Sequence, residues 1–123
     1  MSETTLNGVA NVMLGTRDLD RAVTFYEETL GLALQGRSEG FAFLDGGSVT
    51  LALSTAHAAL ATPVAGATEI VFAVDDVTAA HAALAGRGVA FMNEPRNVTG
   101  DRWAATFRDP DGHLLSIFGP KGV

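Results

Sequence analysis

The sequence predicts an α+β fold made of two βαβββ modules, and three observations lead to this prediction. A strand followed by a capping aspartate and an amphipathic helix occurs twice, with caps at Asp18 and Asp76. Short apolar alternations separated by glycines follow each helix. An aromatic residue, an acidic turn with glycine and an alternating strand also occur twice, at residues 43–53 and 107–118. We therefore infer an internal duplication with a repeat of about sixty residues.

The first module spans about residues 8–54. Residues 9–14 alternate apolar and polar side chains and are predicted to form a strand. Asp18 then caps a helix whose apolar positions recur at helical spacing, and Gly31 ends it. Residues 32–54 contain three short strands separated by glycines.

The second module spans about residues 68–119 and repeats this plan. A connector at residues 55–67, which is rich in alanine and has no clear period, joins the two modules. The helix that follows Asp76 ends at the glycines of residues 86–88. The strands of this module are predicted at residues 69–74, 89–92, 102–108 and 113–118.

Side-chain parity indicates which residues of each strand face away from the helices. Two such modules placed side by side, with the helices on the outer face, leave their uncovered faces to form a curved eight-stranded cup. Strand residues alternate between the two faces, so the apolar set of each strand packs under its helix and the other set faces the cup. The predicted cup residues of the first and last strands of each module are Asn11, Met13, Gly15, Thr50, Ala52, Ser54, Glu69, Val71, Ala73, Leu114, Ser116 and Phe118.

Length and composition indicate one globular domain over residues 1–123, since 47% of the residues are hydrophobic. The formal net charge is −6 and no basic stripe occurs, which disfavours nucleic acid and anionic membranes as partners. The sequence contains no cysteine, which excludes disulfides and thiolate chemistry. No signal peptide or membrane-length apolar run is visible, so we expect a cytoplasmic protein.

Several of these segments resemble the vicinal oxygen chelate superfamily, which includes glyoxalase I, extradiol dioxygenases and bleomycin-binding proteins. The resemblance rests on residues 18–26, 30–31, 74–77, 88–89 and 109–112, and it covers nearly the whole chain. These residues form caps and turns, so they indicate the fold and not the activity. The resemblance implies small-molecule binding and, as in the bleomycin-binding branch, a homodimer with sites between subunits.

The resemblance also implies where a metal would bind in members that use one. The ligand positions on the first strand of each module match Asn11 and Glu69, each seven residues before its cap. The position on the last strand matches Ser116, and its first-module partner is Ala52, or Leu51 if the register shifts by one. Neither alanine nor leucine binds a metal, and divalent ions need several convergent donors. We therefore expect no metal and no other cofactor.

The three histidines do not restore a metal site. His57 falls in the connector, His81 lies just outside the apolar stripe of the second helix, and His113 has the parity of the core residue Leu115. Imidazole is a ligand only where other ligands converge, so each is read as an ordinary surface or half-buried side chain.

Other residues provide the expected small-molecule contacts. Glu69 is either a carboxylate at the floor of the cup that contacts a ligand, or a solvated residue at a strand entry. Met13 and Phe118 supply apolar surface, and Trp103 is predicted as a stacking residue at the rim or as a dimer anchor. Phe41 and Phe43 share one face of a short strand, and the sequence does not fix which face this is, although the analogy with Phe107 favours the core for Phe43.

The favoured function is metal-independent sequestration of an apolar or aromatic small molecule, for which antibiotic self-resistance is one setting. Its predicted ligand-binding residues are Asn11, Met13, Ala52, Glu69, Trp103, Ser116 and Phe118. One alternative is a lyase or isomerase of the glyoxalase type, with Glu69 as general base. A second alternative is a structural or regulatory relative without chemistry.

Overall fold

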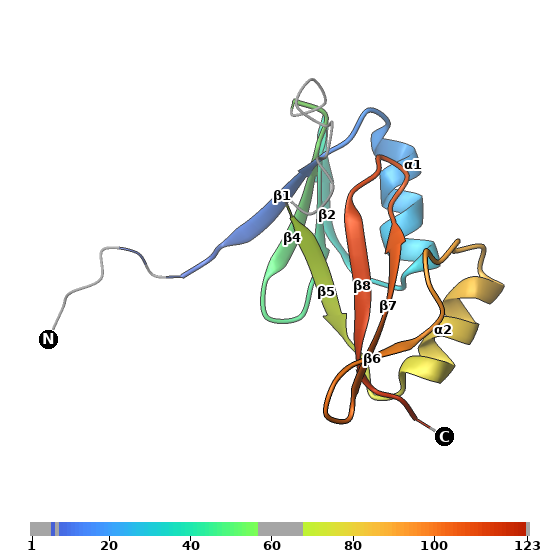
Figure 1. Ribbon diagram of the computed structural model, residues 1–123. Coiled ribbons are helices and arrows are strands. Elements are labelled where there is room, and N and C mark those ends of the chain that lie inside the picture. Colours follow the sequence, from blue (N-terminus) through green and yellow to red (C-terminus); the bar gives the residue numbers. More distant parts are fainter. Residues whose placement is uncertain (1–5, 7, 57–67, 123) are drawn as a thin grey trace, which may run out of the picture.

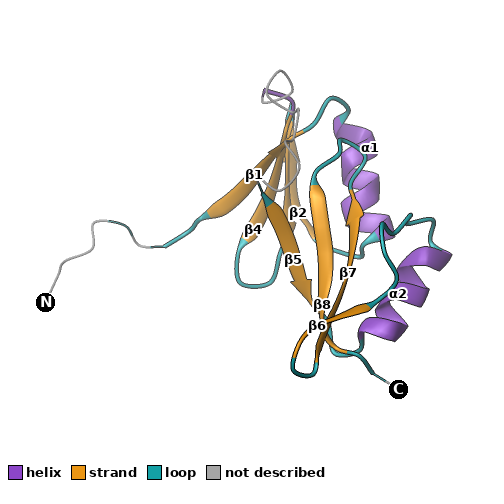
Figure 2. Ribbon diagram, in the orientation of Figure 1, coloured by secondary structure: helices purple, strands orange, loops and turns teal. Residues whose placement is uncertain are grey.

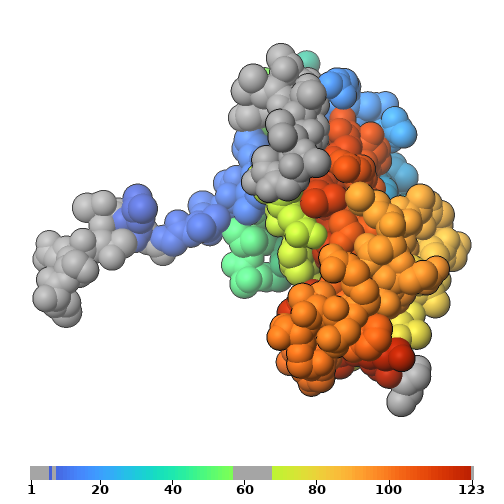
Figure 3. Space-filling model, in the orientation of Figure 1, coloured from blue at the N-terminus to red at the C-terminus, as the bar shows by residue number. Residues whose placement is uncertain are grey.

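Two four-stranded mixed sheets and two helical segments make up the fold (Figure 1). The computed structural model describes residues 6, 8–56 and 68–122. Both helical segments lie on the same side of the strands in this view, and the described part of the segment before the first strand projects away from the body (Figures 2 and 3). The predicted α+β architecture of two βαβββ modules is confirmed, with the strands in two separate hydrogen-bonded sheets.

The first sheet has the strand order β1-β4-β3-β2, in which β1 and β4 are parallel and the other pairs antiparallel. All three strands predicted between the first helix and the connector are present. Glycine with positive φ (+83°) at Gly40 allows the tight turn between β2 and β3. The strands are β1 (Asn11–Gly15), β2 (Leu34–Ser38), β3 (Phe41–Asp45) and β4 (Thr50–Ser54).

The helical segment of module one begins as an α-helix, α1 (Leu19–Val23), and continues as a π-helix, η1 (Thr24–Thr29). The Asp18 carboxylate accepts a hydrogen bond from the Arg21 amide, which confirms the predicted cap. The wider π turns end where the Leu30 amide donates to the Phe25 carbonyl, and Gly31 follows with φ of +84°. Tyr26, inside this π segment, is completely buried.

The second sheet repeats the plan with the order β5-β8-β7-β6. Its helix begins after Asp76, whose carboxylate accepts from the Ala79 amide at 2.8 Å. The elements are β5 (Glu69–Ala73), α2 (Val77–Gly86), β6 (Arg96–Thr99), β7 (Arg102–Arg108) and β8 (Leu114–Pro120).

The predicted strand at residues 89–92 is wrong. Val89 is buried, and Phe91 makes a single bridge to Phe107. The rings of Phe91 and Phe107 pack edge-on, with their centroids 5.2 Å apart. Val89 and Phe91 therefore pack into the core and no continuous strand forms, whereas Met92 is 55% exposed. The strand that does form, β6, is fully exposed and has no apolar alternation, so the pattern of hydrophobic residues does not indicate it.

Both sheets contribute their helix-facing residues to one hydrophobic core. Leu14, Leu51 and Leu53 from module one join Leu115 and Ile117 from module two, all at 5% exposure or less. The helix-facing parity predicted for the first and last strands of each module is confirmed, since Val12, Ile70, Phe72 and Val74 also pack against this core. Burial of this shared face is the main favourable term in folding.

The turn of residues 109–112 joins module two to module one. The buried Tyr26 hydroxyl donates to Asp109 Oδ2 at 2.7 Å, and the Arg17 amide donates to Asp111 Oδ1 at 3.0 Å. Next to them, His113 Nε2 lies 2.8 Å from the Gly15 carbonyl oxygen. This turn thus fixes the end of β1 and the first helical segment against the second sheet. Within the described ranges, no helix is long and apolar enough to cross a membrane.

Candidate functional site

A small hollow lies on the face of the second sheet that points away from the helices. We call it the β5–β8 hollow, and its volume is about 160 Å³. The strands place its residues through simple alternation, because every second residue of β5, β7 and β8 faces this side. Its lining residues are Glu69, Val71, Arg96, Val98, Ala104, Thr106, Ser116 and Phe118.

Three polar side chains form a hydrogen-bonded chain in the hollow. Ser116 Oγ donates to Glu69 Oε2, and Ser116 Oγ lies 2.9 Å from Thr106 Oγ1. A serine hydroxyl has one proton, and here it points to the carboxylate, so Thr106 is the donor in the second bond. The chain therefore runs from Thr106 through Ser116 to Glu69, and it uses one of the two carboxylate oxygens.

The sheet register explains why these groups meet. Thr106 and Ser116 are direct partners across the antiparallel β7–β8 pair, and Ser116 is aligned with Val71 on the parallel neighbour β5. Ser116 is 3% exposed, whereas Glu69 is exposed at the start of β5. The hydroxyls are thus fixed by the sheet, and the carboxylate at the edge is accessible to a ligand.

Apolar side chains form the rest of the hollow. Val71 is 51% exposed and Val98 is 48% exposed, and Phe118 lies half-buried beside Ala104. This combination of apolar walls and a few fixed polar groups is typical of small-molecule sites. Arg96, from the exposed strand β6, adds a positive charge to the lining.

The predicted site residues of module one lie on the equivalent face of the first sheet. Met13 is aligned with Ala52 as Val71 is with Ser116, so Ala52 is the counterpart of Ser116. Leu51, the other possibility, is 2% exposed in the core. Asn11 is exposed at the start of β1, the position that Glu69 has on β5. None of Asn11, Met13 and Ala52 lines the β5–β8 hollow, and Ala52 is completely buried.

Two aromatic residues differ from expectation. Phe43 is the direct partner of Ala52 across β3 and β4, so it lies on the face of Ala52 and Met13. The analogy with Phe107 that favoured the core for Phe43 does not hold, because the pairing of β3 with β4 aligns Leu44 with the core residue Leu51 instead. Trp103 packs against the hydrophobic core on the opposite face of β7 from the hollow, with Lys121 Nζ 4.9 Å from its ring centroid.

The structure brings together Glu69, Ser116 and Phe118 of the predicted site and leaves Trp103 outside it. Sequence reasoning missed Thr106, Arg96 and Val98. Alternation along residues 102–108 puts Thr106 on the other face of the strand from the core residue Phe107, so the sequence does indicate that Thr106 faces the hollow. Arg96 and Val98 lie on β6, which no hydrophobic pattern marks.

The donor set at the metal positions that the sequence resemblance implies does not fit a divalent ion. Asn11, Glu69 and Ser116 offer one carboxylate, one amide and a hydroxyl already bonded to that carboxylate, and Ala52 offers none. No three histidine, cysteine or acidic side chains converge in the part of the chain that the structure describes.

The histidines within the described residues lie outside the hollow. His81 packs its ring against Phe91, with centroids 4.2 Å apart, and His113 contacts the Gly15 carbonyl. His57 lies outside the described residues.

Two paired βαβββ modules define the class of fold, and comparison with known proteins identifies the family. Residues 8–117 match the Glyoxalase/Bleomycin resistance protein/Dioxygenase superfamily, and the chain belongs to this family. Proteins of this family commonly bind small molecules and often form dimers.

Three relatives illustrate the range of the family. A protein of Mycolicibacterium smegmatis is 36% identical over 113 residues, which cover 91% of this chain and 93% of that protein. The crystal structure of TnmS3, an antibiotic-binding protein from Streptomyces sp. CB03234, has 28% identity and a TM-score of 0.79, and the match covers 96% of this chain and 99% of that chain. Lactoylglutathione lyase from Agrobacterium tumefaciens shares the fold, with 18% identity, a TM-score of 0.75 and coverage of 96% and 97%.

Proposed function

We propose that this protein binds an apolar or aromatic small molecule through the β5–β8 hollow, without a resident metal. The observation that carries the proposal is the Thr106–Ser116–Glu69 chain beneath apolar walls. Because this chain occupies one carboxylate oxygen, the other remains to accept a hydrogen bond from a hydroxyl, amide or ammonium group of the ligand. Val71, Val98 and Phe118 then contact its apolar body.

The size of the hollow supports a site made by two copies of the chain. Its volume of about 160 Å³ is small beside the roughly 300–1,000 Å³ that ligand pockets occupy. A second copy that places the exposed face of its first sheet over this hollow adds Met13 and Phe43 as the opposite wall. Met13 is 37% exposed and Val71 51% exposed, so each sheet has apolar surface for such a contact.

Two further observations favour sequestration. TnmS3, at 28% identity over nearly its full length, is an antibiotic-binding protein. The donor set at the family's metal positions is also poor, which disfavours chemistry that depends on a metal held by these side chains. The alternative function, a lyase or isomerase with Glu69 as general base, is favoured by the same hydroxyl chain, since hydrogen-bonded hydroxyls also position a base.

The experiment is isothermal titration calorimetry with a panel of flat aromatic compounds that carry hydroxyl or amine groups. We expect one or more to bind wild-type protein, and we expect Ala104→Leu, which fills the hollow, to abolish that binding. Ala82→Leu, on the exposed side of α2, is the matched control and leaves binding unchanged. Equal binding by the Ala104→Leu variant would contradict the proposal. Loss of binding in both variants would also count against a site in this hollow.

A further inference from the structure

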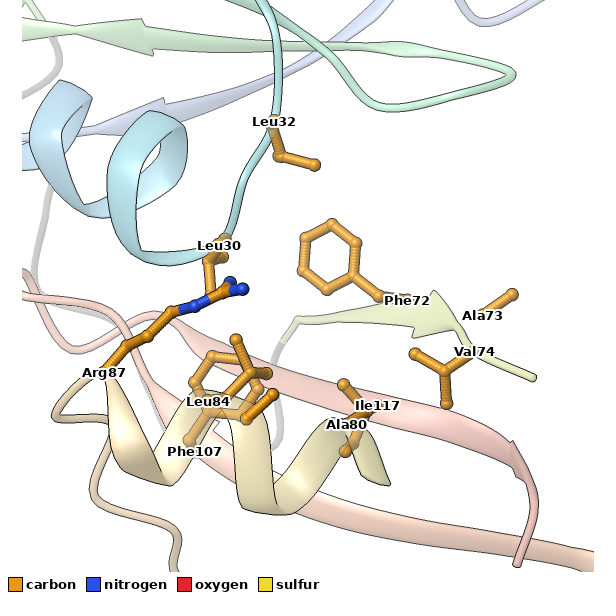
Figure 4. A pocket seen from close by; sticks show the side chains of 11 residues that line it. Leu30, Leu32, Phe72, Ala73, Val74, Ala80, Leu84, Arg87, Phe107 and Ile117 are labelled. Atoms are coloured by element: carbon orange, nitrogen blue, oxygen red, sulfur yellow. The ribbon is translucent and has the colours of Figure 1, made fainter. Parts of the chain in front are cut away.

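A second and larger cavity lies on the opposite side of the second sheet, between the helical segments. We call it the helix-side cavity, and its volume is about 310 Å³ (Figure 4). Leu30 and Leu32 border it from the end of η1, Phe72 from β5, and Leu84 from α2. Phe107 forms part of its inner wall. Its volume falls in the range of small-molecule pockets.

The helix-side cavity is separate from the β5–β8 hollow. No residue lines both, and alternation along β5 explains why, because Phe72 faces the helices and Val71 faces the hollow. A ligand in one therefore contacts a different face of the sheet from a ligand in the other.

The lining of the helix-side cavity is apolar except for one side chain. Ten of its residues are leucine, phenylalanine, alanine, valine or isoleucine, and the eleventh is Arg87. The Arg87 side chain extends from the end of α2 toward Leu30 in Figure 4. A cation beside an apolar cavity is complementary to a ligand that has an apolar body and an anionic head.

The contacts of Arg87 leave it able to bind such a head group. Its Nη1 donates to the Thr29 carbonyl oxygen at 3.1 Å, which uses one of its five N–H donors. No carboxylate forms an ion pair with it among the described residues, although the chain has fourteen acidic residues. The bond to Thr29 holds the guanidinium at the end of η1, close to Leu30.

We propose that the helix-side cavity is a second binding site, which takes a monocarboxylate with an apolar chain or ring. The apolar body lies between Leu84 and Phe72, and the carboxylate pairs with Arg87. This site is independent of the binding proposed for the β5–β8 hollow, and its occupancy does not require Glu69.

The test uses decanoate and its uncharged analogue decanol as probes, with binding followed by amide chemical shifts. We expect decanoate to shift the amides of residues 72–74 and 80–87, and to leave those of residues 104–106 and 116 unchanged. Arg87→Met keeps the apolar stem and removes the charge, so it weakens decanoate binding by about tenfold and leaves decanol binding nearly unchanged. Arg21→Met, at an exposed position of α1 that lines neither cavity, is the matched control and changes neither affinity.

A second variant tests the cavity itself. Ala80 lines the cavity, so Ala80→Leu fills it and abolishes binding of both probes. Ala82→Leu, on the same helix and outside the cavity, keeps both affinities. Equal affinity of the Arg87→Met variant for decanoate, binding that survives Ala80→Leu, or shifts confined to the β5–β8 hollow would overturn the proposal. Absence of decanoate binding, with shifts that follow protein concentration instead, would assign the cavity to a contact between copies and would also overturn it.

Discussion

Glu69 is the side chain on which the two candidate functions differ most. In the binding function it accepts one hydrogen bond from the ligand, so we expect Glu69→Gln to weaken affinity by about tenfold without abolishing it. Calorimetry with the best compound of the panel measures this change. In the enzymatic alternative, the same variant retains binding and loses turnover entirely.

Ser116→Ala is the companion to that variant. It removes the hydroxyl between Thr106 and Glu69 and leaves the carboxylate itself in place. We expect a smaller loss of affinity than for Glu69→Gln, because Glu69 still accepts from the ligand. A larger loss would show that the ligand binds Ser116 directly.

Tyr26 makes a buried hydrogen bond that can be tested by stability. Its hydroxyl is the donor to Asp109, which is 6% exposed and also accepts from the amides of Asp111 and His113. Tyr26→Phe leaves a buried carboxylate oxygen without this partner, so we expect a loss of about 1–3 kcal/mol in the free energy of unfolding. Urea denaturation at pH 7 measures it, and an unchanged midpoint would contradict the prediction.

The same bond predicts a dependence on alkaline pH. Burial, together with the negative charge of Asp109, raises the pKa of Tyr26 well above its ordinary value of 10.0. The neutral phenol is thus favoured by folding, and its contribution to stability is complete below pH 10 and is lost as the pH rises toward the folded-state pKa. We expect the free energy of unfolding to fall by about 1.4 kcal/mol per pH unit in this window.

Tyr26→Phe is the control for this loss of stability at alkaline pH. The comparison is simple because few other groups of the chain titrate in this pH range. Tyr26 is the single tyrosine and Lys121 the single lysine of the sequence. The phenylalanine variant should therefore show a nearly flat profile above pH 10. An equal decline in both proteins would mean that another group causes it.

At the scale of single residues, alternation along strands predicts Glu69, Ser116 and Phe118 on one face, and the structure agrees. Alternation does not predict which hydroxyl donates to which in the Thr106–Ser116–Glu69 chain, because this depends on the pairing of Thr106 with Ser116 across β7 and β8. Trp103 has the same strand parity as the core residue Phe107, so alternation along β7 correctly places it on the core side. The prediction of a rim location instead gave weight to the loop that precedes Trp103 in sequence.

Each helical element begins at an aspartate cap, and the second cap offers a clear test. Asp76 accepts from the Ala79 amide, whereas its exposed neighbour Asp75 has no such contact among the bonds described. We expect Asp76→Ala to reduce the free energy of unfolding by about 1 kcal/mol. Asp75→Ala, the matched control, should change it by less than about 0.5 kcal/mol. Equal effects of the two variants in thermal denaturation would contradict a capping role.

Elements with a strong hydrophobic period were predictable, and those without one were not. The strands at 69–73 and 102–108 and both helix starts follow from alternation and capping. Strand β6 has local polar contacts, such as the hydrogen bond that the Asn97 side-chain amide donates to the Gly100 carbonyl oxygen, and no hydrophobic pattern in the sequence predicts it. Tyr26 lies within the π turns of η1 and bonds to Asp109, 83 residues away in sequence, a contact that no local pattern indicates.

For the whole molecule, the proposed two-copy site predicts that Val71→Arg disrupts association. Val71 is half-exposed on β5, a strand with one hydrogen-bonded neighbour in the described sheet. An arginine there places an unpaired charge in the contact, so we expect a shift to monomer in sedimentation velocity and loss of aromatic ligand binding.

Met92→Arg is the matched control for this substitution. Met92 is similarly exposed, at 55%, and lies outside the β5–β8 hollow. It should leave both association and binding unchanged. A dimer that survives Val71→Arg and is lost in Met92→Arg would place the interface elsewhere.

The duplicated pattern predicted two modules but not how one chain arranges them. Sequence parity assigns faces to strands, yet the relative placement of the sheets depends on contacts such as Tyr26 with Asp109 and Gly15 with His113. These contacts join residues of different modules and have no local signal. The predicted cup residues of the two modules lie on two separate sheets, and Asn11, Met13 and Ala52 of module one do not line the β5–β8 hollow.

The turn of residues 109–112 has a consequence for how the protein is made. Its bonds to module one join residues 83, 94 and 98 positions apart, and all of them depend on the last hairpin of the chain. During synthesis, module one therefore leaves the ribosome with the end of β1 and its first helical segment unsecured until the C-terminal residues emerge. Ribosome-bound chains that stop before residue 109 should accordingly be cleaved by protease within module one, and released full-length chains should resist.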